Sequence, residues 1–196
     1  MTIYLLCRNL EMLVEWKQQF AECRDVDVVM DDFAHFMDTH KVQCVVSPAN
    51  SYGSMDGGYD AAIIDYFGIQ LEKAVQKYIL DNFYGEQPVG TSFTIDIPGT
   101  EQKLIHTPTM RLPSKIREPE IVYQCMRTTL MEAIKNKIES IVIPVFGGGT
   151  GMVPYRTIAK FMKRGYDQIK NPSSVEYCSK KRGSGSKICW KPTKNT

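Results

Sequence analysis

Asn50 and Asp60 are the two polar residues best placed for chemistry in this sequence. Asn50 follows the largely apolar, β-branched run 42–46, and Asp60 stands near the expected start of a helix. An amide just past a buried strand can bind a ligand hydroxyl, and the dipole at a helix start favours the carboxylate form of an aspartate. Taken alone, each residue is explained about equally well as structural. Asn50 could bond its own backbone in a turn, and Asp60 could be an ordinary first-turn residue.

The chain contains two glycine-rich turns, one between Asn50 and Asp60 and a second about 90 residues later. The first contains Gly53, Gly57 and Gly58 and precedes the expected helix 59–67; the second, at 147–151, reads Gly-Gly-Gly-Thr-Gly. Glycine lets the backbone approach a ligand closely, and free N–H groups at a helix start can bind phosphate. Neither turn matches a P-loop or a G-x-G-x-x-G fingerprint. On motif alone, phosphate binding and plain tight turns are therefore about equally supported.

The elements that must position these turns follow from the hydrophobic pattern. Helices alternate with apolar strands, which predicts a three-layer α/β/α domain with a mixed, mostly parallel central sheet. In such sheets ligands bind beyond the carboxyl ends of the strands, so both turns should face one crevice. Asp32 follows a strand at the same edge, or it is simply an N-cap. The expected strands are 2–7, 26–30, 42–46, 91–97, 103–107 and 140–146, and the expected helices are 10–20, 59–67, 69–80, 120–137 and 154–169.

The length of 196 residues fits one domain, residues 1–170, followed by a basic tail, residues 171–196. The tail carries six Lys or Arg against one Glu, whereas the preceding residues carry 18 basic and 21 acidic side chains. We expect a flexible, solvated tail with one more short strand at 175–178. A nucleic-acid partner has little support, because Trp190 is the aromatic side chain among these charges.

Six cysteines without a C-x-x-C motif indicate reduced thiols rather than a disulfide framework. Cys178 and Cys189 are interpreted as exposed thiols rather than as half of a metal site. His35, His40 and His106 show no metal-ligand spacing, and we expect no metal and no cofactor. No signal peptide and no apolar run of membrane-spanning length is found, so the expectation is a cytoplasmic protein without membrane contact, monomeric by default.

Three segments of the chain resemble macrodomains, in particular the phage-tail-type macrodomain subgroup. The first segment is the expected first ligand loop, the second is a mid-chain stretch, and the third contains the second glycine-rich turn. The resemblance covers about residues 1–170. The segments are Ser47-Pro48-Ala49-Asn50-Ser51 followed by Met55-Asp56-Gly57-Gly58-Tyr59-Asp60, then 104–113, and 144–154.

This resemblance implies a macrodomain fold that binds ADP-ribose. Asp32 matches the adenine-binding Asp of the family, and Asn50 matches the Asn beside the distal ribose. Asp60 stands where hydrolytic macrodomains carry an Asp, although Tyr59 replaces a small Val and Ala61 replaces a Gly. The implied ADP-ribose-binding residues are Asp32, Phe33, Ala49, Asn50, Gly57, Gly58, Tyr59, Gly147, Gly148, Gly149, Thr150 and Gly151.

The function expected from the resemblance is removal of ADP-ribose from a mono-ADP-ribosylated macromolecule. Asn50 would hold the distal ribose, and Asp60 would orient or activate water as a general base. Three alternatives stay open. The protein could read ADP-ribose without turnover, act as a phosphatase on ADP-ribose 1″-phosphate, or have a structural role without a ligand.

Overall fold

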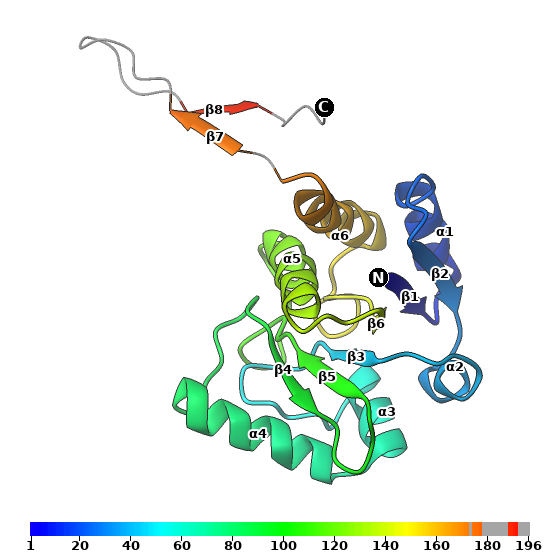
Figure 1. Cartoon of the computed structure of the whole chain (residues 1–196), viewed down its shortest axis with the longest axis vertical. Coiled ribbons are helices and arrows are strands. Elements are labelled where there is room, and N and C mark those ends of the chain that lie inside the picture. Colours follow the sequence, from blue (N-terminus) through cyan, green and yellow to red (C-terminus); the bar gives the residue numbers. More distant parts are fainter. Residues whose placement is uncertain (173, 178–187, 192–196) are drawn as a thin grey trace.

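A six-stranded sheet with helices on both sides forms the body of the protein (Figure 1). The computed structural model describes residues 1–172, 174–177 and 188–191. The strands of the sheet are β1 (Thr2–Cys7), β2 (Val26–Met30), β3 (Cys44–Ser47), β4 (Phe93–Asp96), β5 (Lys103–His106) and β6 (Ser140–Ile143). The helices are α1 (Leu10–Gln19), α2 (Phe33–Thr39), α3 (Gly58–Phe67), α4 (Gln70–Phe83), α5 (Glu120–Lys135) and α6 (Tyr155–Lys170). Two further strands, β7 (Ser174–Tyr177) and β8 (Ile188–Lys191), pair with each other in antiparallel fashion.

The strand order of the sheet brings the two glycine-rich turns together. The order is β2-β1-β6-β3-β5-β4, and every pairing is parallel except that of β4 with β5. The strands before the two turns, β3 and β6, are direct neighbours, with Val45 opposite Val142. Because parallel neighbours end at the same edge, both turns leave the sheet side by side, as the pattern of strands and helices predicts.

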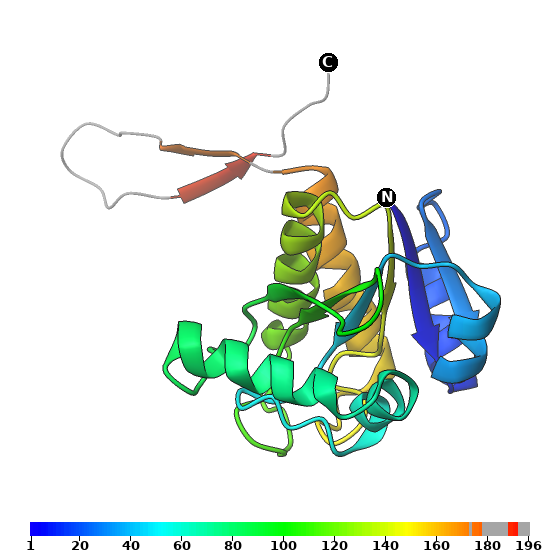
Figure 2. The ribbon, with the colours of Figure 1, turned by 60° about the horizontal axis from the view of Figure 1, so that its bottom comes forward.

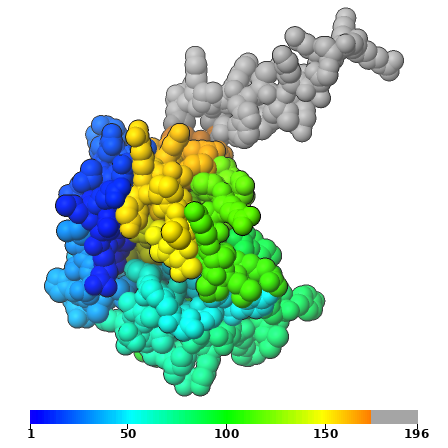
Figure 3. All heavy atoms as spheres, turned by 180° about the vertical axis from the view of Figure 1, so that it is seen from behind, coloured from blue at the N-terminus to red at the C-terminus, as the bar shows by residue number. Residues whose placement is uncertain are grey.

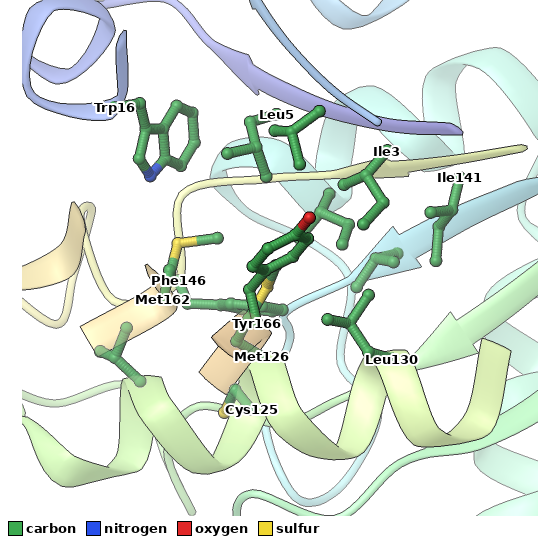
Figure 4. Packing of buried hydrophobic residues seen from close by; sticks show 14 of the residues in the cluster. Ile3, Leu5, Trp16, Cys125, Met126, Leu130, Ile141, Phe146, Met162 and Tyr166 are labelled. Carbon is green, nitrogen blue, oxygen red and sulfur yellow. The ribbon is translucent and has the colours of Figure 1, made fainter. Parts of the chain in front are cut away.

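Alternating side chains along each strand divide the core into two clusters. Ile3, Leu5 and Ile141 pack with α1, α5 and α6, as Figure 4 shows around Trp16 and Phe146. Intervening strand residues, such as Val45 and Val142, pack with α2, α3 and α4 on the other side of the sheet. In Figures 1 and 2, α4 and α5 lie on opposite sides of β4 and β5. The expected three-layer α/β/α architecture is confirmed.

The boundaries of most elements follow from local signals that the sequence contains. Asn9 caps α1, because its side chain accepts hydrogen bonds from the backbone N–H of Glu11 at 2.9 Å and Met12 at 3.2 Å. The strand expected at 140–146 ends at Ile143, because Pro144 follows and cannot donate a ladder hydrogen bond.

Cys7, Cys23, Cys44 and Cys125 are free thiols.

The main departures from the expected elements are one helix and one strand. The sequence interpretation ended the second strand at 31–33 and missed α2, which buries Phe33, Phe36 and Met37. It also expected no strand after 178, where β8 lies. Cys178 and most of residues 180–196 lie outside the described residues.

Candidate functional site

A cavity of about 840 Å³ opens at the carboxyl ends of the strands. Its walls are the turn between β3 and α3, called here the first loop (residues 48–57), and the turn between β6 and α6, called here the second loop (residues 144–154). On the face shown in Figure 3, the yellow segment near residue 150 meets the cyan segment near residue 55. Of the residues expected to bind a ligand, those lining the cavity are Asp32, Phe33, Ala49, Asn50, Gly57, Gly58, Tyr59, Asp60, Gly147, Gly149, Thr150 and Gly151.

Gly148 is the expected site residue that does not line this cavity. A Cβ at this position would lie 2.6 Å from the Val145 side chain and 3.4 Å from those of Ile158 and Tyr155. The lack of a side chain at residue 148 therefore lets the second loop pack against the start of α6.

Asp60 is buried in the first turn of α3, where it contacts Ser47, a residue that the sequence interpretation did not select as a site residue. The Ser47 hydroxyl donates a 2.6 Å hydrogen bond to Asp60 Oδ1. Ser47 is fully buried, and Asp60 is only 7% exposed. In the described part of the chain, no hydrogen bond is found from another residue to the second oxygen, Oδ2, and the backbone N–H of Asp60 itself stabilises the carboxylate less than Ser47 does. The carboxyl group thus has one anchored oxygen and one that is left for a ligand or water.

The charge of Asp60 is governed by burial rather than by the helix dipole. The position at a helix start led us to expect a favoured carboxylate, and α3 indeed begins at Gly58. Burial nevertheless raises the pKa of Asp60 to about 7, with a smaller upward contribution from the carboxylate of Asp56. The hydrogen bond from Ser47 acts in the opposite direction. A carboxyl group with a pKa near neutral can exchange a proton during a reaction.

Asn50 uses its side chain to shape the first loop. Its Oδ1 accepts from the backbone N–H of Tyr52 at 3.0 Å and of Ser54 at 3.4 Å, and its Nδ2 donates to the Ser54 carbonyl at 3.1 Å. The structural alternative considered from sequence is therefore present, while Asn50 also lines the cavity. The second N–H of Nδ2 has no acceptor within the described residues.

The second loop presents backbone to the cavity. It is held by hydrogen bonds from Val153 N to Gly147 O at 3.1 Å and from Met152 N to Gly149 O at 2.9 Å. In the part of the chain that the structure describes, the N–H groups of Gly149, Thr150 and Gly151 have no acceptor. Consecutive free N–H groups of this kind form a concave site suited to an anion. α3 adds to this, because its N-cap, Gly57, has no side chain to bond its first N–H groups.

Asp32 and Phe33 form the end of the cavity beside β2. Asp32 caps α2 by accepting from the His35 N–H at 2.9 Å, so the structural alternative for this residue also holds. Phe33 makes edge-to-face contacts with Tyr59 and Tyr66, with ring centroids 5.3 and 5.8 Å apart. These rings make an apolar wall next to the acidic cap.

The cavity is also lined by charged residues that the sequence interpretation did not select. They are Arg8, Asp31, Asp56 and Asp65. Arg8 directly follows β1 and Asp31 directly follows β2, so their positions at strand ends were an available signal. Ser47 had a signal too, because it is the polar last residue of an otherwise apolar strand.

Comparison with known families identifies the chain. A family model described as Macro domain matches residues 46–162, which is more than half of the chain and includes both loops. The chain belongs to the macro domain family. The matched span lies within the domain expected at residues 1–170.

Similar proteins include one curated relative and several solved macrodomains. A protein of Aquifex aeolicus (strain VF5) described as uncharacterized is 33% identical over 120 residues, which are 60% of this chain and 68% of that protein. The macrodomain of Mycobacterium tuberculosis DarG has a TM-score of 0.57 at 16% identity, over 67% of this chain and 85% of that one. The Oceanobacillus iheyensis macrodomain, solved with ADP, has a TM-score of 0.51 at 25% identity, over 62% and 70% of the two chains.

This macro domain extends beyond the matched span in both directions. β1, α1, β2 and α2 precede residue 46, and Arg8 after β1 and Asp31 and Asp32 after β2 line the cavity. At the other end, α6 continues past residue 162 to Lys170. None of the helices in the described ranges combines the length and the apolar character needed to cross a membrane.

Proposed function

We propose that this macro domain binds ADP-ribose and hydrolyses it from a mono-ADP-ribosylated macromolecule. The observation that carries the proposal is the buried carboxyl group of Asp60 at the wall of a cavity large enough for a nucleotide. The O. iheyensis macrodomain was solved with ADP, which supports a nucleoside diphosphate ligand for this chain. Membership of the phage-tail-type subgroup stays a prediction.

The diphosphate would lie on the second loop. The free N–H groups of Gly149, Thr150 and Gly151 line the cavity and can donate to its oxygens. The adenine would lie toward Asp32 and Phe33, and the distal ribose toward Asn50, Gly57 and Gly58. In this orientation the anomeric carbon of the distal ribose comes next to α3, where Asp60 lies.

Asp60 would act as a general base toward a water molecule. The water oxygen would bond to the anomeric carbon as the bond from that carbon to the modified side chain breaks. The water proton would pass to the Asp60 carboxylate, and the electron pair of the broken bond would leave with the side chain. Since the pKa of Asp60 is about 7, a substantial fraction is ionised at neutral pH and available for this step.

The charge of the cavity favours hydrolysis of a conjugate over a phosphatase reaction. Five aspartates line it, namely Asp31, Asp32, Asp56, Asp60 and Asp65, against one arginine, Arg8. ADP-ribose 1″-phosphate carries an additional terminal phosphate, which would lie near Asp56 and Asp60 and be repelled by them. We therefore expect this compound to bind more weakly than ADP-ribose.

The test is release of ADP-ribose from a protein mono-ADP-ribosylated on acidic side chains, followed on a gel and by chromatography. Asp60→Asn and Asp60→Ala should each lower the rate at pH 7.5 by at least a hundredfold. Asp27→Asn removes the same charge from an exposed position of β2, away from the cavity, and should leave the rate unchanged. An unaltered rate in both Asp60 variants would reject the catalytic role.

Binding is tested separately by calorimetry and by thermal shift with ADP-ribose, AMP and NAD. A ligand that binds only the folded protein must raise the melting temperature. Binding of ADP-ribose without release from the conjugate would make the protein a reader. Release of phosphate from ADP-ribose 1″-phosphate would support the phosphatase alternative, and no binding of any nucleotide would reject the proposal.

A further inference from the structure

Ser47 is aimed at Asp60 by the geometry of the sheet. The other residues of β3, Cys44, Val45 and Val46, are fully buried. Side chains alternate along a strand, and Val45 packs into the cluster on the α3 side whereas Val46 packs on the opposite side. Ser47 therefore faces α3, and its hydroxyl reaches Asp60 Oδ1 at 2.6 Å.

We propose that Ser47 is a positioning residue for the reaction, because its hydroxyl holds Asp60 Oδ1 and leaves Oδ2 directed to the reacting water. The inference rests on the proposed function. A serine hydroxyl rotates freely unless it has a partner, and here the carboxylate is its acceptor. The hydrogen bond both fixes the rotation of the carboxyl group and favours its ionised form.

The surroundings of Asp60 make this hydrogen bond its main stabilising contact. Asp56 in the first loop is a second carboxylate that disfavours ionisation of Asp60. Tyr59 precedes Asp60 on α3, and the buried Tyr59 hydroxyl has no hydrogen-bond partner among the described residues. His106 lies beside Ser47 in the register of β3 and β5, and burial lowers the pKa of this imidazole to about 3, so that it carries no charge.

The helices packed against α3 supply no compensating charge. The side chains of α2 and α4 that enter the shared core are apolar, including Phe33 and Phe36 of α2 and Leu71 of α4. A hydrogen bond to a charged group is worth more than one between neutral groups. Removal of the Ser47 hydroxyl should therefore shift the titration of Asp60 markedly upward.

The decisive experiment measures the titration midpoint of the Asp60 carboxyl carbon by ¹³C NMR, with Asp60→Asn used to assign the resonance. In Ser47→Ala the midpoint should rise by about one unit or more, since a charge-assisted hydrogen bond is lost. Ser47→Thr retains a hydroxyl and should restore a midpoint close to that of the unaltered protein. An unchanged midpoint in Ser47→Ala would overturn the inference.

Turnover of the ADP-ribosylated protein gives the second measurement. The alkaline shift should lower the rate of Ser47→Ala about fivefold at pH 7 and hardly at all at pH 9, because a rise of the pKa from about 7 to about 8 lowers the ionised fraction from about one half to about one eleventh at pH 7. An equal loss at every pH would indicate only a structural defect and would overturn the inference. The NMR midpoint needs no substrate, so the effect of Ser47 on Asp60 stays measurable even if the protein proves to be a reader.

Discussion

The first loop reaches the cavity with side chains such as those of Asn50 and Asp56, and Asp60 of α3 lies nearby. The second loop reaches the cavity mainly with the backbone of glycines, namely Gly147, Gly149 and Gly151. The five aspartates of the cavity wall lie between β2 and α2, in the first loop and in α3, and none lies in the second loop. A neutral sugar tolerates carboxylates that would repel a phosphate. Under the proposed function, the two walls would therefore take different parts of one ligand, the diphosphate on the second loop and the ribose on the first.

The two loops are also held in place by different means. The first is anchored by side chains, since Tyr52 and Arg111 both bond Glu86, and by an isolated bridge between Asn50 and Met110. The second is held by backbone hydrogen bonds and by close packing at Gly147, Gly148 and Gly151 that leaves no room for a Cβ. A polar anchor can be altered gradually by substitution, whereas a position without room for a Cβ cannot. The following substitutions use this contrast.

The largest effect is expected from Asp60→Asn on stability at alkaline pH. The folded protein raises the pKa of Asp60 to about 7, above the ordinary value, so it holds the proton more tightly than the unfolded chain does. Ionisation of Asp60 therefore lowers the free energy of unfolding. This loss of stability is absent below about pH 4 and is complete once the pH has risen through about 7, where it reaches roughly 4 kcal/mol. Urea denaturation at pH 8.5 should show Asp60→Asn to be more stable by up to that amount.

The same pair of proteins at pH 4 provides the control. Both side chains are then uncharged, and both accept the hydrogen bond from Ser47, so the free energies of unfolding should nearly agree. A gain of equal size at both pH values would mean that burial of charge is not the cause.

Gly151→Ala should have the next largest effect, this time on the second loop. Its Cβ would lie 2.6 Å from the carbonyl oxygen of Gly147, a backbone atom that cannot rotate away. We expect a loss of about 1–3 kcal/mol in the free energy of unfolding, together with weaker ADP-ribose binding. Gly149→Ala is the matched control, because no atom lies within 4 Å of its Cβ. Equal stability of the two variants in urea denaturation would contradict the packing account.

Gly57→Val and Gly149→Val ask whether one ligand touches both walls. Neither position has a protein atom within 4 Å of an added Cβ, so folding should change little. If ADP-ribose lies between the loops, each variant should weaken its binding about tenfold in calorimetry while the melting temperature of the free protein stays nearly constant. Loss of affinity in only one variant would assign the ligand to a single wall.

The smallest effect is expected from Arg111→Met at the anchor of the first loop. Its guanidinium bonds both carboxylate oxygens of Glu86, at 2.7 and 2.9 Å, and lies over the ring of Tyr52. The pair is well exposed, so solvent and salt screen it. ADP-ribose affinity should fall less than threefold at low salt, with a smaller loss at 0.5 M NaCl. A loss independent of salt would point to a distorted loop instead.

The layers of the fold could be predicted because each depends on local patterns. Apolar runs give the strands, and Asn9 and Gly68 mark the limits of helices. The short α2 was missed, although Phe33, Phe36 and Met37 have helical spacing and an N-cap was considered for Asp32, because no helix was assigned after that cap. The missing helix leaves the three-layer architecture unchanged.

The residues that line the cavity could largely be predicted from sequence, but the contacts among them could not. The family pattern and the strand ends bring twelve of the thirteen expected residues to one cavity. The contact between Ser47 and Asp60 depends on the orientation of β3 relative to α3, which no local pattern contains. For the same reason the raised pKa of Asp60 was missed, since burial is a tertiary property and opposes the dipole of the helix.

The central position of β1 has a consequence for the boundaries of this domain. β1 lies between β2 and β6, with Ile3 opposite Ile141 and Leu5 opposite Ile143. A chain cut to the family-matched residues 46–162 would lose it, and β6 would then expose a row of unpaired backbone groups along with the apolar face that Trp16 covers. Such a fragment would be prone to self-association, so the span recognisable by family likeness is smaller than the unit that can stay dissolved as a folded protein.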